Sequence, residues 1–325
     1  MKQFQGRIAV VTGGGTGMGR ELARQLSAEG CHVAMCDVSA DGMAEARELC
    51  LADAPHGTRV TTTLADVSDE RQLEAFRDAV VREHRTQHVN LLFNNAGIGA
   101  AGSLIRDSRA DWEKTFGVCW FGVYYGTRVF LPLLLAADEA HLVNTSSVNG
   151  FWASLGPHTA HTAYSSAKFA VKGFTEALIN DFRINAPHVK VSLVMPGHVG
   201  TSIVINSARL LGRDPKQMSD DQLAEARATI ERLGFEIGAV SNDQLRELLQ
   251  QRAESFRDDA PMSAAEAAKV ILDGVRAERW RILVGRDAEI LDRMVRETPE
   301  EAYERSFFDR FAAAAGWQLP RPEQS

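Results

Sequence analysis

The segment Arg7-Ile-Ala-Val-Val-Thr-Gly-Gly-Gly-Thr-Gly-Met-Gly19 decides the fold of this chain. Its first half is a short apolar run rich in β-branched residues, which indicates a buried strand, and a glycine-rich loop follows directly. Residues 20–29 then have helical periodicity that ends at Gly30, and residues 31–36 form a second strand-like run with Asp37 at its tip. This order of strand, glycine loop, helix, strand and acid is typical of a dinucleotide-binding βαβ unit.

The glycines and the acid suit different parts of a dinucleotide. Glycine permits a tight turn and lets a pyrophosphate approach the helix N-terminus, where free N–H groups favour anions. A carboxylate at Asp37 can accept hydrogen bonds from the adenosine ribose hydroxyls and would repel a 2′-phosphate. Neither Thr16 nor Val38 offers a cation to that phosphate. The sequence therefore predicts NAD rather than NADP; the alternative is that Asp37 only caps the next turn.

The same alternation continues and predicts a single domain over residues 1–325. Strands are expected at residues 60–64, 89–93, 142–145, 189–194 and 281–285, and helices at residues 71–85, 111–136, 163–184 and 263–278. Repeated β-α units predict an α/β fold, a doubly wound and mostly parallel sheet of the Rossmann type with helices on both faces. Function is expected at the carboxyl ends of the strands, where Asp66, Asn94, Ser147 and Pro196-Gly197 fall.

Tyr164 and Lys168 stand four residues apart in a predicted helix, so they share one face, one turn apart. A free tyrosine titrates at about pH 10, and a neighbouring cation lowers the pKa of a phenol. A tyrosine tuned in this way can exchange a proton with an alcohol or carbonyl oxygen near neutral pH. An isolated tyrosine and lysine pair with this spacing more often lies on a solvated helix face. Here the pair indicates a catalytic site because it occurs together with the glycine loop and Asp37.

Together these motifs resemble the short-chain dehydrogenase/reductase family of the TGxxxGxG and YxxxK type, over residues 5 to about 205. The resemblance implies that Ser147 hydrogen-bonds the substrate oxygen, that Tyr164 is the general acid/base, and that Lys168 holds the nicotinamide ribose and lowers the pKa of Tyr164. It also implies a set of cofactor-binding residues: Gly13, Thr16, Gly17, Met18, Gly19, Asp37, Asp66, Val67, Asn94, Ala96, Gly97, Tyr164, Lys168, Pro196, Val199 and Thr201.

The chain departs from the family pattern at two places near the predicted site. The spacing from Ser147 to Tyr164 is longer than usual, which predicts a short insertion over residues 151–163. Cys119 stands where many members carry an asparagine that positions a water, and a thiol lacks the donor and acceptor pair of an amide. By their positions in loops around the site, four residues are expected in the substrate pocket: Phe151, Trp152, His198 and Ile203.

Residues 202–262 are long for a connection between strands, and they carry helical signals of their own. Ser219-x-x-Gln222 and Ser241-x-x-Gln244 fit capping boxes. We expect two helices that form a lid over the substrate side; the alternative is an interaction surface. A helical C-terminal extension is expected over residues 286–325.

Bulk properties exclude several classes of function. The net charge of −7 argues against a nucleic-acid or anionic-membrane surface, and no long apolar run predicts a membrane span. The four cysteines lack zinc or CxxC spacing, which indicates reduced thiols in a cytoplasmic protein. His158 and His161 have metal-like spacing but no third ligand nearby, so no metal site is expected.

The sequence thus predicts an NAD-dependent oxidoreductase that interconverts a small-molecule secondary alcohol and a ketone. Two alternatives stay open: an NAD-binding dehydratase or epimerase that uses the same tyrosine and lysine, and a catalytically weak NAD-sensing interaction protein. The family resemblance implies a homotetramer or homodimer packed through the helices at residues 111–136 and 163–184. The identity of the substrate does not follow from the sequence.

Overall fold

The computed structural model describes residues 1–99, 102–156, 159–232 and 234–317. At its centre lies a seven-stranded sheet with the strand order β3-β2-β1-β4-β5-β6-β7, and every neighbouring pair is parallel. The strands are β1 (Ile8–Thr12), β2 (His32–Asp37), β3 (Val60–Leu64), β4 (Leu91–Asn94), β5 (Ala140–Thr145), β6 (Val189–Pro196) and β7 (Arg281–Val284). The predicted doubly wound sheet is confirmed, and its strand order reverses between β1 and β4, where such sheets bind ligands.

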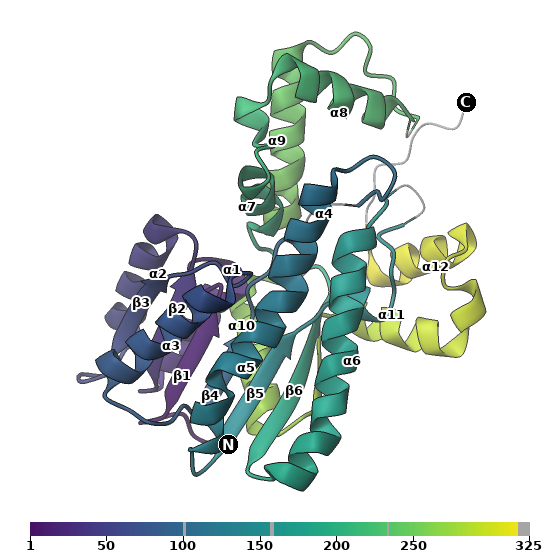
Figure 1. Ribbon diagram of the computed structural model, residues 1–325. Helices are drawn as coiled ribbons and strands as arrows, with labels where there is room; N and C mark the ends of the chain where they lie inside the picture. Colours follow the sequence, from purple (N-terminus) through teal and green to yellow (C-terminus); the bar gives the residue numbers. More distant parts are fainter. Residues whose placement is uncertain (100–101, 157–158, 233, 318–325) are drawn as a thin grey trace.

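Helices cover both faces of the sheet (Figure 1). One face carries α3 (Glu70–His84), α4 (Arg109–Phe116), α5 (Gly122–Leu135) and α6 (Thr162–Asn185). The other face carries α1 (Gly17–Ala28), α2 (Ala40–Asp53) and α10 (Ala264–Arg276). Helix α10, predicted over residues 263–278, begins at a capping box of Ser263 and Glu266. With both faces covered, the strands are apolar along most of their length, as a buried parallel sheet requires.

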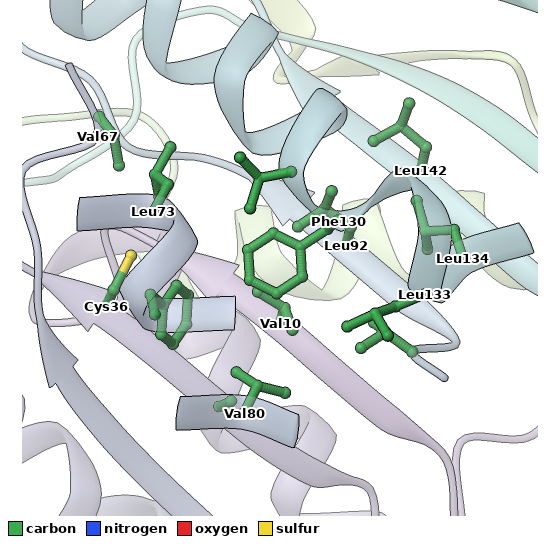
Figure 2. Close-up of a cluster of buried hydrophobic side chains, with 14 of the residues drawn as sticks. Val10, Cys36, Val67, Leu73, Val80, Leu92, Phe130, Leu133, Leu134 and Leu142 are labelled. Carbon is green, nitrogen blue, oxygen red and sulfur yellow. The ribbon is translucent and has the colours of Figure 1, made fainter. Parts of the chain in front are cut away.

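A core between the sheet and α3, α5 and α6 holds the first face together. Phe76 of α3 and Phe130 of α5 meet edge to face with ring centroids 5.5 Å apart. Figure 2 shows Phe130 beside Val10 and Leu92 of the two central strands. Full burial of such a side chain stabilises the fold by about 1.5–3 kcal/mol. This packing fixes the strand ends from which the site residues emerge.

The long helix predicted over residues 111–136 has a different geometry in its middle. It begins as expected, because the Ser108 hydroxyl accepts a hydrogen bond from the Asp111 amide at 3.0 Å. A π-helical turn over Gly117–Phe121 then separates α4 from α5 and contains Cys119. Such wide turns are frequent at functional sites.

The continuous helical stretch Arg109–Leu135 is also the one segment among the described residues that is long and apolar enough to span a membrane. More than half of its apolar window is buried inside the protein, against α3, α6 and the sheet. Core helices of soluble folds meet the same test of length and composition. Its burial here therefore fits a core helix.

The segment after β6 forms the predicted helices and one more. Helix α7 (Ile203–Leu210) comes first, followed by a short 3₁₀ turn (Pro215–Gln217), α8 (Asp220–Arg232) and α9 (Asn242–Asp258). The capping box of Ser241 and Gln244 is present at the start of α9. Helices α8 and α9 project beyond the sheet (Figure 1) and share a small core of their own.

The C-terminal extension consists of α11 (Arg286–Glu297), a 3₁₀ turn (Pro299–Glu301) and α12 (Arg305–Ala315). Its core includes Phe307, Phe308 and Phe311, and these rings surround Trp152 from the loop after β5. The extension therefore packs directly on the predicted insertion beside the site. His158 and the tail from residue 318 lie outside the described residues.

Candidate active site

The glycine loop between β1 and α1 is packed too tightly for side chains. Gly13 has φ of +68°, and a Cβ there would lie 2.7 Å from the Ala96 backbone. A Cβ on Gly19 would overlap the Gly13 carbonyl group. The loop thus presents backbone rather than side chains at the start of α1, and this cradle fits the phosphates of a dinucleotide.

Asp37 is held at the edge of this cradle. One carboxylate oxygen accepts a hydrogen bond from the Gly15 amide at 3.0 Å, and the other accepts one from the Ser39 amide at 3.0 Å. The acid is therefore fixed beside the glycine loop. Its position fits contact with an adenosine ribose.

A cleft of about 370 Å³ runs along the carboxyl ends of the strands. It joins the glycine loop, the ends of β2 and β3, the loop after β4, α4 and α7. Many predicted cofactor residues line it, and so does Ile203 of the predicted substrate pocket; other lining residues were not among the predicted site residues. The full lining consists of Gly13, Thr16, Gly17, Met18, Asp37, Val38, Ser39, Ala65, Asp66, Val67, Asn95, Ala96, Gly97, Ile98, Lys114, Val118, Thr201, Ile203, Asn206, Arg209 and Leu210.

Six predicted cofactor residues do not line this cleft: Gly19, Asn94, Tyr164, Lys168, Pro196 and Val199. Tyr164 and Lys168 lie with Ser147, and the other four lie behind the lining. The Asn94 side chain donates to Asn144 at 2.9 Å and braces β4 against β5. Gly19 packs under the glycine loop, Pro196 ends β6, and Val199 is buried in the core of the second face. They shape the cleft wall through packing.

Ser147, Tyr164 and Lys168 come together at the ends of β5 and α6. The Lys168 ammonium donates to the Thr145 carbonyl oxygen at 2.9 Å and lies 5.4 Å from the centroid of the Tyr164 ring. The Ser147 hydroxyl lies beside the phenol and favours its ionised form. Ser146, by contrast, donates its hydroxyl proton to the Lys168 carbonyl oxygen at 2.8 Å. The structure thus places Ser147, and not Ser146, next to the phenol.

The electrostatics of the pair differ from the expectation that Lys168 lowers the pKa of Tyr164. Burial is the largest influence and raises the pKa of the Tyr164 phenol above its usual range. Burial also lowers the pKa of Lys168. In the protein alone, removal of the phenol from water is the dominant influence, because the charged form is the one that loses hydration, and the neighbouring Cys119 acts in the same direction. Tyr164 is therefore protonated at neutral pH.

His161 forms one wall of the space around the phenol, which the sequence did not reveal. Its ring centroid lies 4.7 Å from that of Tyr164. Burial lowers the pKa of His161 to about 4, so the imidazole is neutral at neutral pH. Its place three residues before Tyr164, at the start of α6, is the only sequence signal that could have indicated this contact.

Cys119 lies inside the π-helical turn and is fully buried. Its thiol donates to the Ile98 carbonyl oxygen at 3.2 Å. A Cβ added to Gly97 would lie 3.6 Å from the Lys168 ammonium and 3.9 Å from the Cys119 sulfur. The position that departs from the family pattern and Lys168 thus both lie close to Gly97.

Three residues predicted for the substrate pocket lie elsewhere. Trp152 is buried among the rings of α12 and donates to the Ala302 carbonyl oxygen at 2.6 Å. Phe151 packs in the adjoining core with the Arg281 guanidinium 5.7 Å from its ring. His198 contacts the Phe256 carbonyl oxygen at 2.7 Å, so its ring joins the loop after β6 to α9. These aromatic rings attach the C-terminal extension and α9 to the core.

Comparison with known proteins places this arrangement in a family. The family model for the short chain dehydrogenases matches residues 7–209. The meso-2,3-butanediol dehydrogenase of Serratia marcescens is 35% identical over 62% of this chain and 74% of its own length.

Two solved structures share the fold. A short chain dehydrogenase/reductase from Burkholderia phymatum in complex with NAD is 31% identical, with a TM-score of 0.73 over 92% of this chain and 96% of its own. A metagenomic short-chain oxidoreductase in complex with NADP is 28% identical, with a TM-score of 0.53 over 60% of this chain and 83% of its own. With the family model matching most of the chain, this protein belongs to the short-chain dehydrogenase family.

Proposed function

We propose that this protein is an NAD-dependent oxidoreductase that interconverts a secondary alcohol and a ketone, with Tyr164 as the general acid/base. The observation that carries the proposal is the convergence of Ser147, Tyr164 and Lys168 beside the dinucleotide cleft. A relative named for the oxidation of a secondary diol supports the alcohol and ketone chemistry. The fixed carboxylate of Asp37 supports NAD over NADP.

The glycine loop, Asp37 and Lys168 are the residues that would hold the cofactor. When bound, its nicotinamide supplies the hydride acceptor or donor. The Ser147 hydroxyl orients the substrate oxygen. The protonated phenol of Tyr164 then donates to a carbonyl oxygen as ketone becomes alcohol, which suits a phenol whose pKa is raised by burial.

In the direction of alcohol oxidation, Tyr164 must take the hydroxyl proton. The Lys168 ammonium, 5.4 Å from the ring, favours the phenolate that this step needs. The Thr145 carbonyl oxygen holds that ammonium in place. Lys168 therefore both contacts the cofactor side and assists the proton transfer.

The test is a screen of secondary alcohols and ketones against both cofactors, followed by NADH fluorescence, in wild type and in Tyr164→Phe. The phenylalanine keeps the ring but loses the hydroxyl, so we expect turnover to fall by about 10²–10⁴-fold, the usual contribution of a general acid/base. Tyr124→Phe, which removes a phenol from α5, is the matched control and should keep full activity.

The outcomes separate the alternatives. Near-wild-type turnover in Tyr164→Phe would remove the tyrosine from the mechanism. If NAD binds and a product forms without net oxidation or reduction of the cofactor, a dehydratase or epimerase is favoured. If NAD binds and no product forms, an interaction protein is favoured.

We further propose a cytoplasmic homotetramer or homodimer that packs through α4, α5 and α6. Aromatic rings run along this surface, where Trp120 meets Phe174 with ring centroids 5.4 Å apart. Phe121, in the π-helical turn before α5, and Phe169 of α6 are 38% and 41% exposed. An apolar aromatic surface of this kind supports burial against a second copy.

A further inference from the structure

Helix α7 lies across the glycine loop. The Asn206 side-chain amide donates to the Thr16 hydroxyl at 3.3 Å. The Thr201 side chain lies 3.2 Å from the place that a Cβ on Gly17 would occupy. Asn206 and Arg209 line the same cleft as the glycine loop and Asp37. The first helix of the segment expected to cap the substrate side is thus the second wall of the cofactor cleft.

The two walls differ in the groups that they offer to a phosphate. The glycine loop contributes backbone and no cation. Two cationic side chains, Lys114 and Arg209, occur among the described lining residues. The Lys114 ammonium donates to the Leu210 carbonyl oxygen at 2.8 Å, so it is engaged in holding the end of α7.

Arg209 keeps most of its hydrogen-bonding capacity. Its Nε lies 3.3 Å from an oxygen of Asp214, and its two terminal nitrogens make no hydrogen bond within the residues that the structure describes. The side chain is 58% exposed. A guanidinium with two free terminal nitrogens matches the paired oxygens of a phosphate.

Contacts on both sides fix α7 in this position. The Ser207 hydroxyl accepts a hydrogen bond from the Gly99 amide at 2.9 Å. The Arg213 guanidinium pairs with the Asp111 carboxylate at 2.7 Å. Because these contacts join α7 to the loop after β4, and the turn that follows α7 to α4, Arg209 is held over the cleft. Asn206 and Arg209, three residues apart, share the helix face that the cleft exposes.

We propose that Arg209 is a further cofactor-binding residue, which contacts the dianionic pyrophosphate of the dinucleotide from α7, opposite the glycine loop. The inference rests on the proposed dinucleotide binding and adds to it a residue outside the motifs. It also assigns α7 to the cofactor, while α8 and α9 lie farther from the glycine loop.

The test compares three ligands by isothermal titration calorimetry: NAD, ADP-ribose and adenosine. NAD and ADP-ribose carry the pyrophosphate and adenosine does not. A hydrogen bond to a charged group contributes about 1.5–3 kcal/mol, so Arg209→Gln should weaken NAD and ADP-ribose by about ten- to a hundredfold. Adenosine affinity should change less than about twofold, and Arg209→Lys should recover part of the loss.

Lys216→Gln is the matched control, because it removes one exposed cation from the same segment outside the cleft. It should leave all three affinities unchanged. Unchanged binding of NAD and ADP-ribose by Arg209→Gln would overturn the inference, and so would an equal loss for adenosine. A rise in substrate KM alone would assign Arg209 to the substrate instead. If wild type binds neither NAD nor ADP-ribose, the proposed function is overturned as well. Failure of the Arg209 inference alone would instead leave NAD binding by wild type intact.

Discussion

The Asp287 carboxylate accepts a hydrogen bond from the His198 amide at 2.7 Å and joins the first turn of α11 to the loop after β6. The same carboxylate accepts a second bond from the Ala288 amide and is only 4% exposed. A Cβ on Gly197 would overlap it. The His198 ring contacts α9, so the C-terminal extension and α9 both meet the loop after β6, which carries the predicted cofactor residues Val199 and Thr201.

Asp287→Ala should loosen that loop. The change leaves the buried His198 and Ala288 amides without their acceptor, and an unsatisfied buried group costs about 1–3 kcal/mol. We expect a lower melting temperature and a higher KM for the cofactor. Glu289→Ala removes an exposed acid from the same helical turn and is the control for the helix N-terminus. Equal effects of the two variants on cofactor KM would show that the carboxylate does not position the loop.

Cys119→Asn should alter kcat more than cofactor affinity. The asparagine restores an amide donor and acceptor beside Lys168, where the thiol now donates only to Ile98. The π-helical turn makes the site tight, so the fold is checked by circular dichroism. Steady-state kinetics and an NAD titration decide the outcome. A change in NAD affinity alone would assign this position to the cofactor wall.

The sequence predicted well which site residues lie near the carboxyl ends of the strands. Each of these residues belongs to a motif with a fixed position relative to a strand or helix. The glycine loop, Asp37 and the Tyr164 helix all lie where their spacing put them. Trp152 and His198, which the sequence predicted in the substrate pocket, each bond to a neighbouring element, since an aromatic residue near a site can equally well anchor such an element. Their partners come from segments far along the chain, Ala302 and Phe256, and no local pattern links them.

Arg209 was missed for a related reason. Its relation to the glycine loop depends on how α7 crosses the cleft, and that crossing is set by tertiary contacts such as the Gly99 to Ser207 hydrogen bond. The pKa of Tyr164 also needed the structure, because burial of the phenol is the largest influence on it. Local spacing shows which groups can meet, but the surrounding packing decides how strongly each is removed from water.

Buried histidines should make the fold sensitive to mild acid. Burial lowers the pKa of His84 to about 4 and that of His141 to about 3. Below about pH 6.5 the unfolded chain binds protons at these positions and the folded chain does not, so the free energy of unfolding falls with pH. Each histidine should contribute about 0.7 kcal/mol per pH unit at about pH 6.5, where half of the unfolded chains are protonated at it, and approach about 1.4 kcal/mol per unit near pH 5.

Urea unfolding from pH 8 to 5 measures this slope. His84→Gln should reduce the slope of the free energy of unfolding against pH by about the contribution of one histidine. His56→Gln, at an exposed position, should leave it unchanged. If His84→Gln has the same slope as wild type, His84 is not the group whose protonation opposes folding.

Phe121→Glu together with Phe169→Glu should dissociate the proposed oligomer. The substitutions place charges on the aromatic surface formed by the π-helical turn, α5 and α6, and burial of unpaired charge opposes association. Leu49→Glu on α2 is the control, because Leu49 has the same 38% exposure as Phe121 but lies on the other face of the sheet. Sedimentation velocity measures the mass. A wild-type monomer, or an unchanged mass in the double variant, would exclude this surface as the interface.

Asp37→Ser with Val38→Arg should narrow or reverse a preference for NAD over NADP. The fixed Asp37 carboxylate should repel the extra phosphate of NADP. Two unit charges about 4 Å apart interact by about 1 kcal/mol in water and about 4 kcal/mol at an effective dielectric constant of about 20. At about 1.4 kcal/mol per decade, that range corresponds to roughly five-fold to nearly thousand-fold discrimination.

The double variant removes this repulsion, and its arginine adds a cation that can bind the phosphate in a bidentate manner. The serine keeps one short acceptor for the Gly15 and Ser39 amides that Asp37 now satisfies, so the glycine loop should keep its shape. The measurement is kcat/KM for both cofactors at one fixed ionic strength, because salt screens the interaction. Asp41→Ser, which removes an exposed acid from the first turn of α2, should leave the cofactor ratio unchanged. If wild type favours NADP, or if the double variant keeps the wild-type ratio, Asp37 does not read the adenosine ribose.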